Sequence, residues 1–336
     1  MNILHLSGTH MGETINITTM AEDKAQEIFQ ILGWERTGPK NINWPCTKEA
    51  NKTHPADAVY YYKEPYSNSN TYLLIDFKSY ASSSITKDTI RGAVESLNEA
   101  LSCAKVSMHF QDLYINSDKK FTIKAVLFIY NHDNKFDKDF LELMPKSVNE
   151  KHRQKDNAVT IDQNNVICII GPQKIKYLLT IANNIYSLRG RKLLPSQEHC
   201  GFFCPDDIYI KLHSEAGNLP LTIERLAAKT HIMRYTDDDG NIKGYDIYSE
   251  SDGTREGYFL YLLDYLRKNN IFQDKKEIRI FLPFDGGRAA VVLQKAKQKF
   301  CDEVTDDFKD KIYRLVSIKE IAAISFRESA LNEGMK

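Results

Sequence analysis

Two short segments of the sequence carry the side chains best suited to chemistry. The first, HPAD at 54–57, ends in Asp57 at the start of a strand-like stretch. The second, LLIDFK at 73–78, ends in Asp76 and Lys78 after an apolar run. Alternate residues of a strand point to the same face, so Asp76 and Lys78 should project together. Charges at the end of a buried strand are costly unless compensated, so this pair calls for an explanation.

Hydrolysis of a phosphodiester bond is the reaction that these groups fit. A divalent cation can hold the phosphate and lower the pKa of a bound water. Mg²⁺ prefers oxygen ligands, usually a few carboxylates, and keeps positions for water and phosphate. A nearby lysine can stabilise the attacking hydroxide and the developing charge. We therefore predict that Asp57 and Asp76 bind Mg²⁺ (or Mn²⁺) and that Lys78 positions or activates the attacking water.

These residues lie in a consistent order of expected elements. An apolar stripe at helical spacing predicts a helix over residues 18–32, capped by Thr18 or Thr19 and ended by Gly33. The remaining expected elements are strands at 58–63, 71–77, 121–130 and 166–170, a loop at 79–84, and helices at 86–104 and from Pro172 onward. The polar stretch 131–157 is interpreted as a loop or insertion with a short helix.

The motifs and their order resemble the PD-(D/E)XK nuclease superfamily, which has the restriction-endonuclease-like fold. Pro55 and Asp57 resemble the first half of that motif, with one residue between them where the name pattern has none. The run from Asp76 to Lys78 resembles the D/E-X-K half. The resemblance covers roughly residues 16–135, extending towards 190. It implies an α/β fold with an αβββαβ core and a nucleic-acid substrate.

The resemblance also implies roles outside the two motifs. A further acidic metal ligand often lies on the first helix, and in Mrr-type families it precedes a glycine and an aromatic residue by about three turns. Glu22 lies 11 positions before Gly33 and Trp34, which fits, and Glu27 on a different face of the helix is the alternative. Substrate contacts are expected from Ser79, Tyr80 and Arg91. For Arg91, simple surface exposure is an equal alternative.

Other short patterns are given structural interpretations. His54 precedes Pro55 and is interpreted as a loop histidine, with an approach to the site as the alternative. His199, Cys200 and Cys204 have an allowed spacing for zinc, but no second pair of ligands lies nearby, so no zinc site is predicted there. The Asp- and Gly-rich segments at 237–240 and 251–254 are interpreted as turns. The sequence contains no P-loop motif, which excludes a P-loop motor.

The character of the sequence changes near residues 191–205. We therefore expect a nuclease-like domain over 1–190 and a second α/β domain over 191–336, which serves recognition, partner binding or dimerisation. The elements expected in this second domain are strands at 207–213, 277–284 and 311–318, helices at 221–230, 258–270 and 286–300, and a turn region at 237–257.

Composition sets broader limits on function. The 45 basic and 45 acidic residues cancel, which argues against a protein that coats nucleic acid by charge alone. The six cysteines are ordinary usage rather than a disulfide framework, and no apolar stretch is long enough to span a membrane. These features predict a cytoplasmic protein without a membrane partner.

The leading hypothesis is a metal-dependent DNA endonuclease in prokaryotic defence against phage or foreign DNA, a setting that rests on the resemblance. A free nuclease would damage its host, so we expect control by a co-encoded protein subunit or an activating ligand, in a homo- or hetero-oligomer. The alternatives are a catalytically silent nucleic-acid-binding or scaffold subunit, and a nuclease that cleaves RNA.

Overall fold

The computed structural model of the protein describes residues 9–65, 67–116, 120–147, 158–203, 219–274, 276–283, 287–302 and 305–321. The chain forms two compact units. The first is built from residues up to 176 and the second from residue 177 onward, except that residues 31–33 and 65–67 belong to the second. Among the described residues, no helix combines the length and the apolar character needed to cross a membrane.

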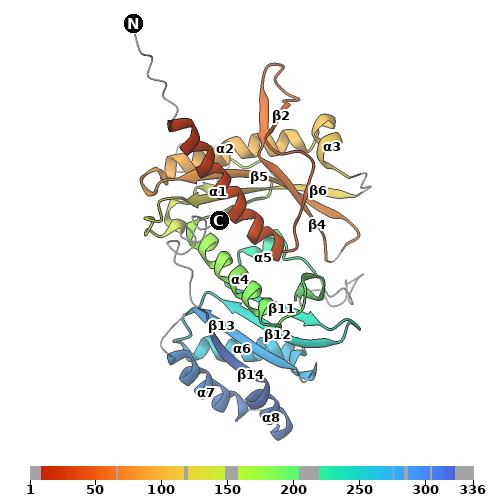
Figure 1. Cartoon of the computed structure of the whole chain (residues 1–336), viewed down its shortest axis with the longest axis vertical. Coiled ribbons are helices and arrows are strands. Elements are labelled where there is room, and N and C mark those ends of the chain that lie inside the picture. The colour runs from red at the N-terminus through yellow and green to blue at the C-terminus, as the bar shows by residue number, and fades with distance from the viewer. Residues whose placement is uncertain are drawn as a thin grey trace. The chain divides into compact units, whose positions relative to one another are not determined.

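The first unit is built on a five-stranded sheet with the order β1-β4-β5-β6-β9 (Figure 1). Its elements are α1 (Thr9–Ile31), β1 (Glu35–Thr37), β2 (Ile42–Pro45), β3 (Thr53–Ala56), β4 (Ala58–Lys63), β5 (Asn70–Tyr80), α2 (Lys87–Ala104), α3 (Met108–Tyr114), β6 (Phe121–Asn131), β7 (Lys146–Ser147), β8 (Ala158–Val159), β9 (Ile167–Ile170) and the start of α4 (Pro172–Gly190), a helix that belongs to the second unit from Tyr177 onward. Strand β4 is antiparallel to β1 and β5, whereas β5, β6 and β9 are parallel. This mixed sheet with flanking helices confirms the predicted α/β class.

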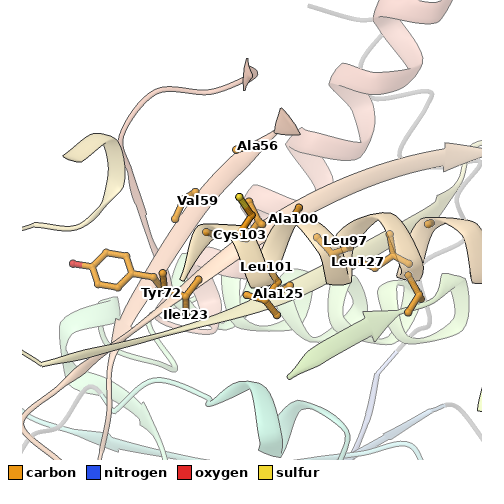
Figure 2. Packing of buried hydrophobic residues seen from close by; sticks show 14 of the residues in the cluster. Ala56, Val59, Tyr72, Leu97, Ala100, Leu101, Cys103, Ile123, Ala125 and Leu127 are labelled. Atoms are coloured by element: carbon orange, nitrogen blue, oxygen red, sulfur yellow. The ribbon is translucent and has the colours of Figure 1, made fainter. Parts of the chain in front are cut away.

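Helix α2 forms where the sequence predicted a helix. The backbone N–H of Thr89 donates to the Thr86 side chain, and the backbone N–H of Thr86 donates to the Thr89 side chain. This reciprocal cap satisfies two N–H groups that the helix itself cannot use. The predicted apolar stripe is buried, namely Ile90, Val94, Leu97 and Leu101. The stripe holds α2 against the sheet, in the core cluster shown in Figure 2.

The sheet buries both of its faces. Neighbouring residues of a strand point to opposite sides, and on β4 these are Val59 and Tyr60. Val59 packs into the cluster that contains the α2 stripe. The Tyr60 ring instead contacts the Phe29 ring of α1, with 4.8 Å between centroids. Helices α1 and α2 therefore cover opposite faces, which explains why β5 is an almost continuous apolar run.

The first unit also departs from the sequence-based expectations. Helix α1 begins at Thr9, about two turns before the predicted cap. Its predicted end is confirmed, because Gly33 has φ 75° and the Trp34 N–H donates to the Phe29 carbonyl at 2.9 Å. Strand β5 continues to Tyr80 into the predicted loop, because its backbone pairs with β6 through that residue. The stretch 131–157 contains a short 3₁₀ turn, Phe140–Leu143, in its described part. Strands β1, β2 and β3 and helix α3 were not predicted, because each is too short for a periodic pattern.

The second unit is built on another five-stranded sheet, in the order β10-β11-β12-β13-β14. Its elements are β10 (Cys200–Phe202), α5 (Ile223–Leu226), β11 (Thr230–Thr236), β12 (Ile242–Ser249), α6 (Glu256–Lys268), β13 (Glu277–Pro283), α7 (Arg288–Cys301), α8 (Asp306–Leu315) and β14 (Val316–Ile321). Strands β12, β13 and β14 are parallel, and β10 and β11 extend the sheet in antiparallel fashion. Apolar residues of α6, α7 and α8 form one core with the sheet.

Three expectations for the second unit were wrong. The predicted turn region 237–257 contains strand β12, and the turn itself is short, with the Gly240 N–H bonded to the Asp237 carbonyl. The predicted strand 311–318 is helical through Leu315 and extended only from Val316. The predicted helix 221–230 shrinks to the single turn α5, and its last residue, Thr230, is the first residue of β11. The predicted strand 207–213 lies outside the described residues.

Candidate active site

Asp57 is the one residue that separates β3 from β4. Its Oδ2 accepts a hydrogen bond of 2.7 Å from the backbone N–H of Phe77, and its carbonyl accepts one of 3.0 Å from the N–H of Asn41. The β4–β5 register pairs Ala58 with Ile75, so one step further sets Asp57 opposite Asp76. The break between the strands thus places the Asp57 carboxylate at the end of the apolar part of β5.

Asp76 and Lys78 lie two residues apart on β5 and form an ion pair of 2.5 Å between Asp76 Oδ1 and Lys78 Nζ. The two side chains are 17% and 33% exposed, so the pair is reachable from solvent. Burial opposes the charge on Lys78, but the carboxylates of Asp76 and Asp57 outweigh it and raise the lysine pKa. Lys78 is therefore a cation at neutral pH, in contact with the motif aspartate.

Glu22 lies on the first helix, is 15% exposed and pairs with Lys40 through a 2.9 Å contact. Its charge acts on Asp57, whose pKa it helps to raise. Glu27, the alternative considered from the sequence, pairs with Lys24 on its own helix at 3.1 Å, and its side chain is 39% exposed. The electrostatics thus link Glu22, from a distant segment of the chain, to the β4–β5 aspartates.

The three carboxylates share one electrostatic field. Burial raises the pKa of Asp57 to about 6, and the charges of Asp76 and Glu22 add to this effect. The Phe77 N–H and the Lys78 cation act in the opposite direction. At neutral pH the group is therefore rich in negative charge, and a divalent cation would relieve that excess. Three carboxylates are the hard oxygen donors that Mg²⁺ or Mn²⁺ prefers, so these residues fit such an ion.

Residues 11–174 match the family model described as the GAPS4 protein PD-(D/E)XK nuclease domain. This chain carries a PD-(D/E)XK nuclease domain. The match covers the first sheet and the segments that supply Glu22, Asp57, Asp76 and Lys78. Comparisons with curated proteins and with solved structures gave no match.

Ser79 and Tyr80 of the nuclease domain continue β5 beyond the motif lysine. The Ser79 hydroxyl lies 3.3 Å from Nδ1 of His132. The Tyr80 carbonyl accepts hydrogen bonds from the Asn131 amide and from the His132 N–H. Burial raises the pKa of the Tyr80 hydroxyl, and Lys78 partly opposes this, so Tyr80 lies within the field of the ion pair. Tyr80 thus adjoins the Asp76–Lys78 pair, whereas the Ser79 side chain is linked to His132.

Arg91 lies on α2, on a different element from the motif. Its guanidinium pairs with Asp88 one turn earlier, at 2.7 Å, and its side chain is 35% exposed. This contact lies within a single helix and ties Arg91 to the surface of α2. Of the three expected substrate contacts, Arg91 is therefore the one that lies on a different element from the β5 motif and pairs within its own helix.

Sequence reasoning missed two features at this end of the sheet. His132 and Asp133 follow β6, and the Asp133 carboxylate accepts hydrogen bonds from the Ser82 N–H and the Asn131 amide. A signal for them exists in the sequence, because Asn131, His132 and Asp133 follow the run 121–130 and the carboxyl ends of parallel strands lie at the same edge of a sheet. Lys40 was also missed, since a lysine in a loop gives no sign of a distant glutamate.

Proposed function

We propose that the nuclease domain hydrolyses DNA phosphodiester bonds with Mg²⁺ (or Mn²⁺) bound by Glu22, Asp57 and Asp76. The observation that carries this proposal is the grouping of acids beside the partly exposed Lys78: burial raises the pKa of Asp57 to about 6, and the charges of Asp76 and Glu22 add to this effect. Perturbed pKa values cluster at functional sites, where burial and neighbouring charges are arranged to shift them. When bound, the cation would hold the scissile phosphate and make a bound water acidic.

Each protein group then has a definite task. Asp57 is held by the Phe77 N–H, so its carboxylate keeps one orientation without a cation of its own. Asp76 fixes the Lys78 ammonium at 2.5 Å, where it can orient the attacking water and stabilise charge on the phosphate oxygens. Lys40 neutralises Glu22 through its ion pair and would yield that carboxylate to the stronger field of a divalent ion.

We propose that Ser79 and Tyr80 contact the substrate beside the motif, and that Arg91 binds a phosphate after releasing Asp88. The zero net charge means that affinity for nucleic acid must come from local groups such as these. The choice of DNA rests on the family resemblance. RNA is the alternative substrate, because none of these side chains is specific for the absence of a 2′-hydroxyl.

We place this activity in prokaryotic defence against phage or foreign DNA. The support is the name of the matched family together with the resemblance to motor-free superfamily members that carry an extra α/β domain. Residues 191–336 would recognise nucleic acid, hold a co-encoded partner subunit or form a dimer. We propose that the partner or an activating ligand controls cleavage, since an unrestrained nuclease would damage host DNA.

A cleavage assay tests this proposal. Supercoiled plasmid, single-stranded DNA and RNA are incubated with the protein in Mg²⁺ or Mn²⁺, with and without the co-encoded neighbour. Asp76→Ala and Lys78→Ala should each lower the cleavage rate by at least about 100-fold, the scale on which a positioned charge acts. Lys63→Ala, an exposed lysine at the end of β4, is the matched control and should cleave normally.

The outcomes separate the hypotheses. Cleavage that survives both motif substitutions would reject the site assignment. Binding without cleavage under every condition would favour the silent binding subunit. Cleavage of RNA alone would move the substrate from DNA to RNA and keep the site. Full plasmid degradation by the isolated chain at cellular Mg²⁺ would reject the proposed control.

A further inference from the structure

A second cluster of potential ligands lies in the first unit and uses none of the carboxylates described above. Cys46 follows β2, His54 lies in β3 and Cys103 lies in the last turn of α2. One ligand atom from each of these residues lies within 4.8 Å of the other two. The cluster joins the β2–β3 hairpin to a helix that is distant in the sequence.

The two sulfur atoms are spaced as ligands of one metal ion. Cys46 Sγ and Cys103 Sγ lie 3.9 Å apart, which is too far for a disulfide bond. Two sulfur atoms bound at about 2.3 Å to one tetrahedral Zn²⁺ are separated by roughly 3.8 Å. A nitrogen bound at about 2.0 Å would lie roughly 3.6 Å from each sulfur, so the imidazole needs to move by at most about 1 Å.

His54 provides an independent sign of a ligand. The residue is 4% exposed, so the sequence-based interpretation as a loop histidine was wrong. Its ring packs on Trp44 with 4.9 Å between centroids, and its Nε2 is buried and makes no hydrogen bond within the described part of the chain. An unsatisfied buried polar atom is costly, and a metal ion bound to Nε2 would remove that cost.

The surroundings of the sulfur atoms suit thiolates. The backbone N–H of Thr47 donates to Cys103 Sγ at 3.0 Å, and the Thr47 hydroxyl lies 3.2 Å from the same sulfur. The N–H of Lys48 donates to Cys46 Sγ at 3.3 Å. Such hydrogen bonds orient ligands and spread their negative charge in metal sites. Two thiolates also balance the charge of a divalent ion.

We propose that Cys46, His54 and Cys103 bind a Zn²⁺ ion, with water as the fourth ligand. Soft sulfur with imidazole favours zinc over Mg²⁺, which takes oxygen ligands. Cys46 is only partly buried, which leaves room for the water. The ion fixes the β2–β3 hairpin to α2, and because Asp57 follows β3 directly, it also anchors the segment that presents this carboxylate.

Metal content is the direct test. The chain is purified without chelator from zinc-supplemented medium, and zinc is measured by mass spectrometry for wild type, Cys46→Ser, His54→Ala and Cys103→Ser. Wild type should hold one zinc per chain, and loss of a direct ligand should weaken zinc binding by more than about 100-fold, beyond the range for an outer-shell partner. Cys168→Ser, a partly buried cysteine of β9 in the same unit, is the control and should retain zinc.

A second measurement needs no variant. Wild type loaded with Co²⁺ should show a thiolate-to-cobalt charge-transfer band and tetrahedral ligand-field absorption, which carboxylate-bound cobalt would not give. Wild type that neither holds zinc nor gives this band would overturn the proposal. Zinc retained by all three ligand variants would also overturn it, as would a disulfide between Cys46 and Cys103 found by peptide mass mapping without reduction. None of these readouts depends on nuclease activity.

Discussion

The substitution Asp57→Asn tests the idea that the nuclease domain carries unbalanced negative charge until a cation binds. Asn keeps the size of the side chain and an oxygen that can accept from the Phe77 N–H. It removes the charge that burial and the neighbouring acids disfavour. We therefore expect this variant to be more stable than wild type in buffer without Mg²⁺ or Mn²⁺, although it should lose cleavage.

The magnitude follows from the pKa of Asp57. A rise of the Asp57 pKa from 3.8 to about 6 means that its ionised form lowers the free energy of unfolding. At 1.36 kcal/mol per pKa unit, the upper limit of this loss is roughly 3 kcal/mol. Asp57 is only partly buried, so solvent screening reduces this to about 1–2 kcal/mol. Because the folded pKa is the higher one, proton binding stabilises the fold below about 3.8, and that stability is lost as the pH rises through about 6. The advantage of the variant should thus be full at pH 7.5 and smaller at pH 5.

Tryptophan fluorescence during urea unfolding can measure this effect in the nuclease domain alone. The sequence has two tryptophans, Trp34 and Trp44, and both are buried in the first unit. Mg²⁺ at about tenfold its Kd should stabilise wild type by roughly 1.4 kcal/mol and should leave Asp57→Asn nearly unchanged. The control is Asp112→Asn, an exposed aspartate of α3, which should shift stability by less than about 0.5 kcal/mol.

Two results would refute this reasoning. One is a metal-free Asp57→Asn variant that is less stable than wild type at pH 7.5, which would mean that the ionised carboxylate stabilises the fold. The other is equal stabilisation of variant and wild type by Mg²⁺, which would place the cation elsewhere.

Three further predictions concern other charges. Glu22→Gln should weaken Mg²⁺ binding, measured by isothermal titration calorimetry, by about tenfold or more, whereas Glu27→Gln should leave it within about twofold; equal losses would reject the assignment of the helix acid. At limiting Mg²⁺, the apparent metal affinity should fall as the pH drops through about 6, because protons compete for Asp57; a flat profile between pH 5 and 7 would contradict this. In the second unit, Arg279 donates to the fully buried Asp246 at 2.6 and 2.8 Å. Arg279→Leu should therefore lower the free energy of unfolding, measured by circular dichroism, by about 3–5 kcal/mol. A loss below about 1 kcal/mol would show that Asp246 finds another partner.

Local sequence determined the elements and the motif pair. The spacing of Ile90, Val94, Leu97 and Leu101 is a property of neighbouring residues, and it gave both the existence of α2 and its buried face. The same holds for the ion pair within β5, because residues two apart on a strand share a face whatever else the chain does. These inferences succeed because they rest on the geometry of a single segment.

Only the tertiary structure decided which distant groups meet. The sequence offered both Glu22 and Glu27 on one helix, and the packing of α1 brings the charge of Glu22 to act on Asp57. The strand β12 was missed because glycine and aspartate near it suggested turns, whereas pairing with β11 and β13 holds it extended.

The cysteine–histidine cluster shows the same limit most clearly. Cys46 and His54 lie on the two arms of the β2–β3 hairpin, whose register fixes their approach. Cys103 reaches them from α2 only because the apolar stripe of that helix packs on the sheet. No spacing rule within one segment encodes that meeting. The sequence therefore determined the chemistry available in each segment, and the packing of segments decided which groups can bind one ion.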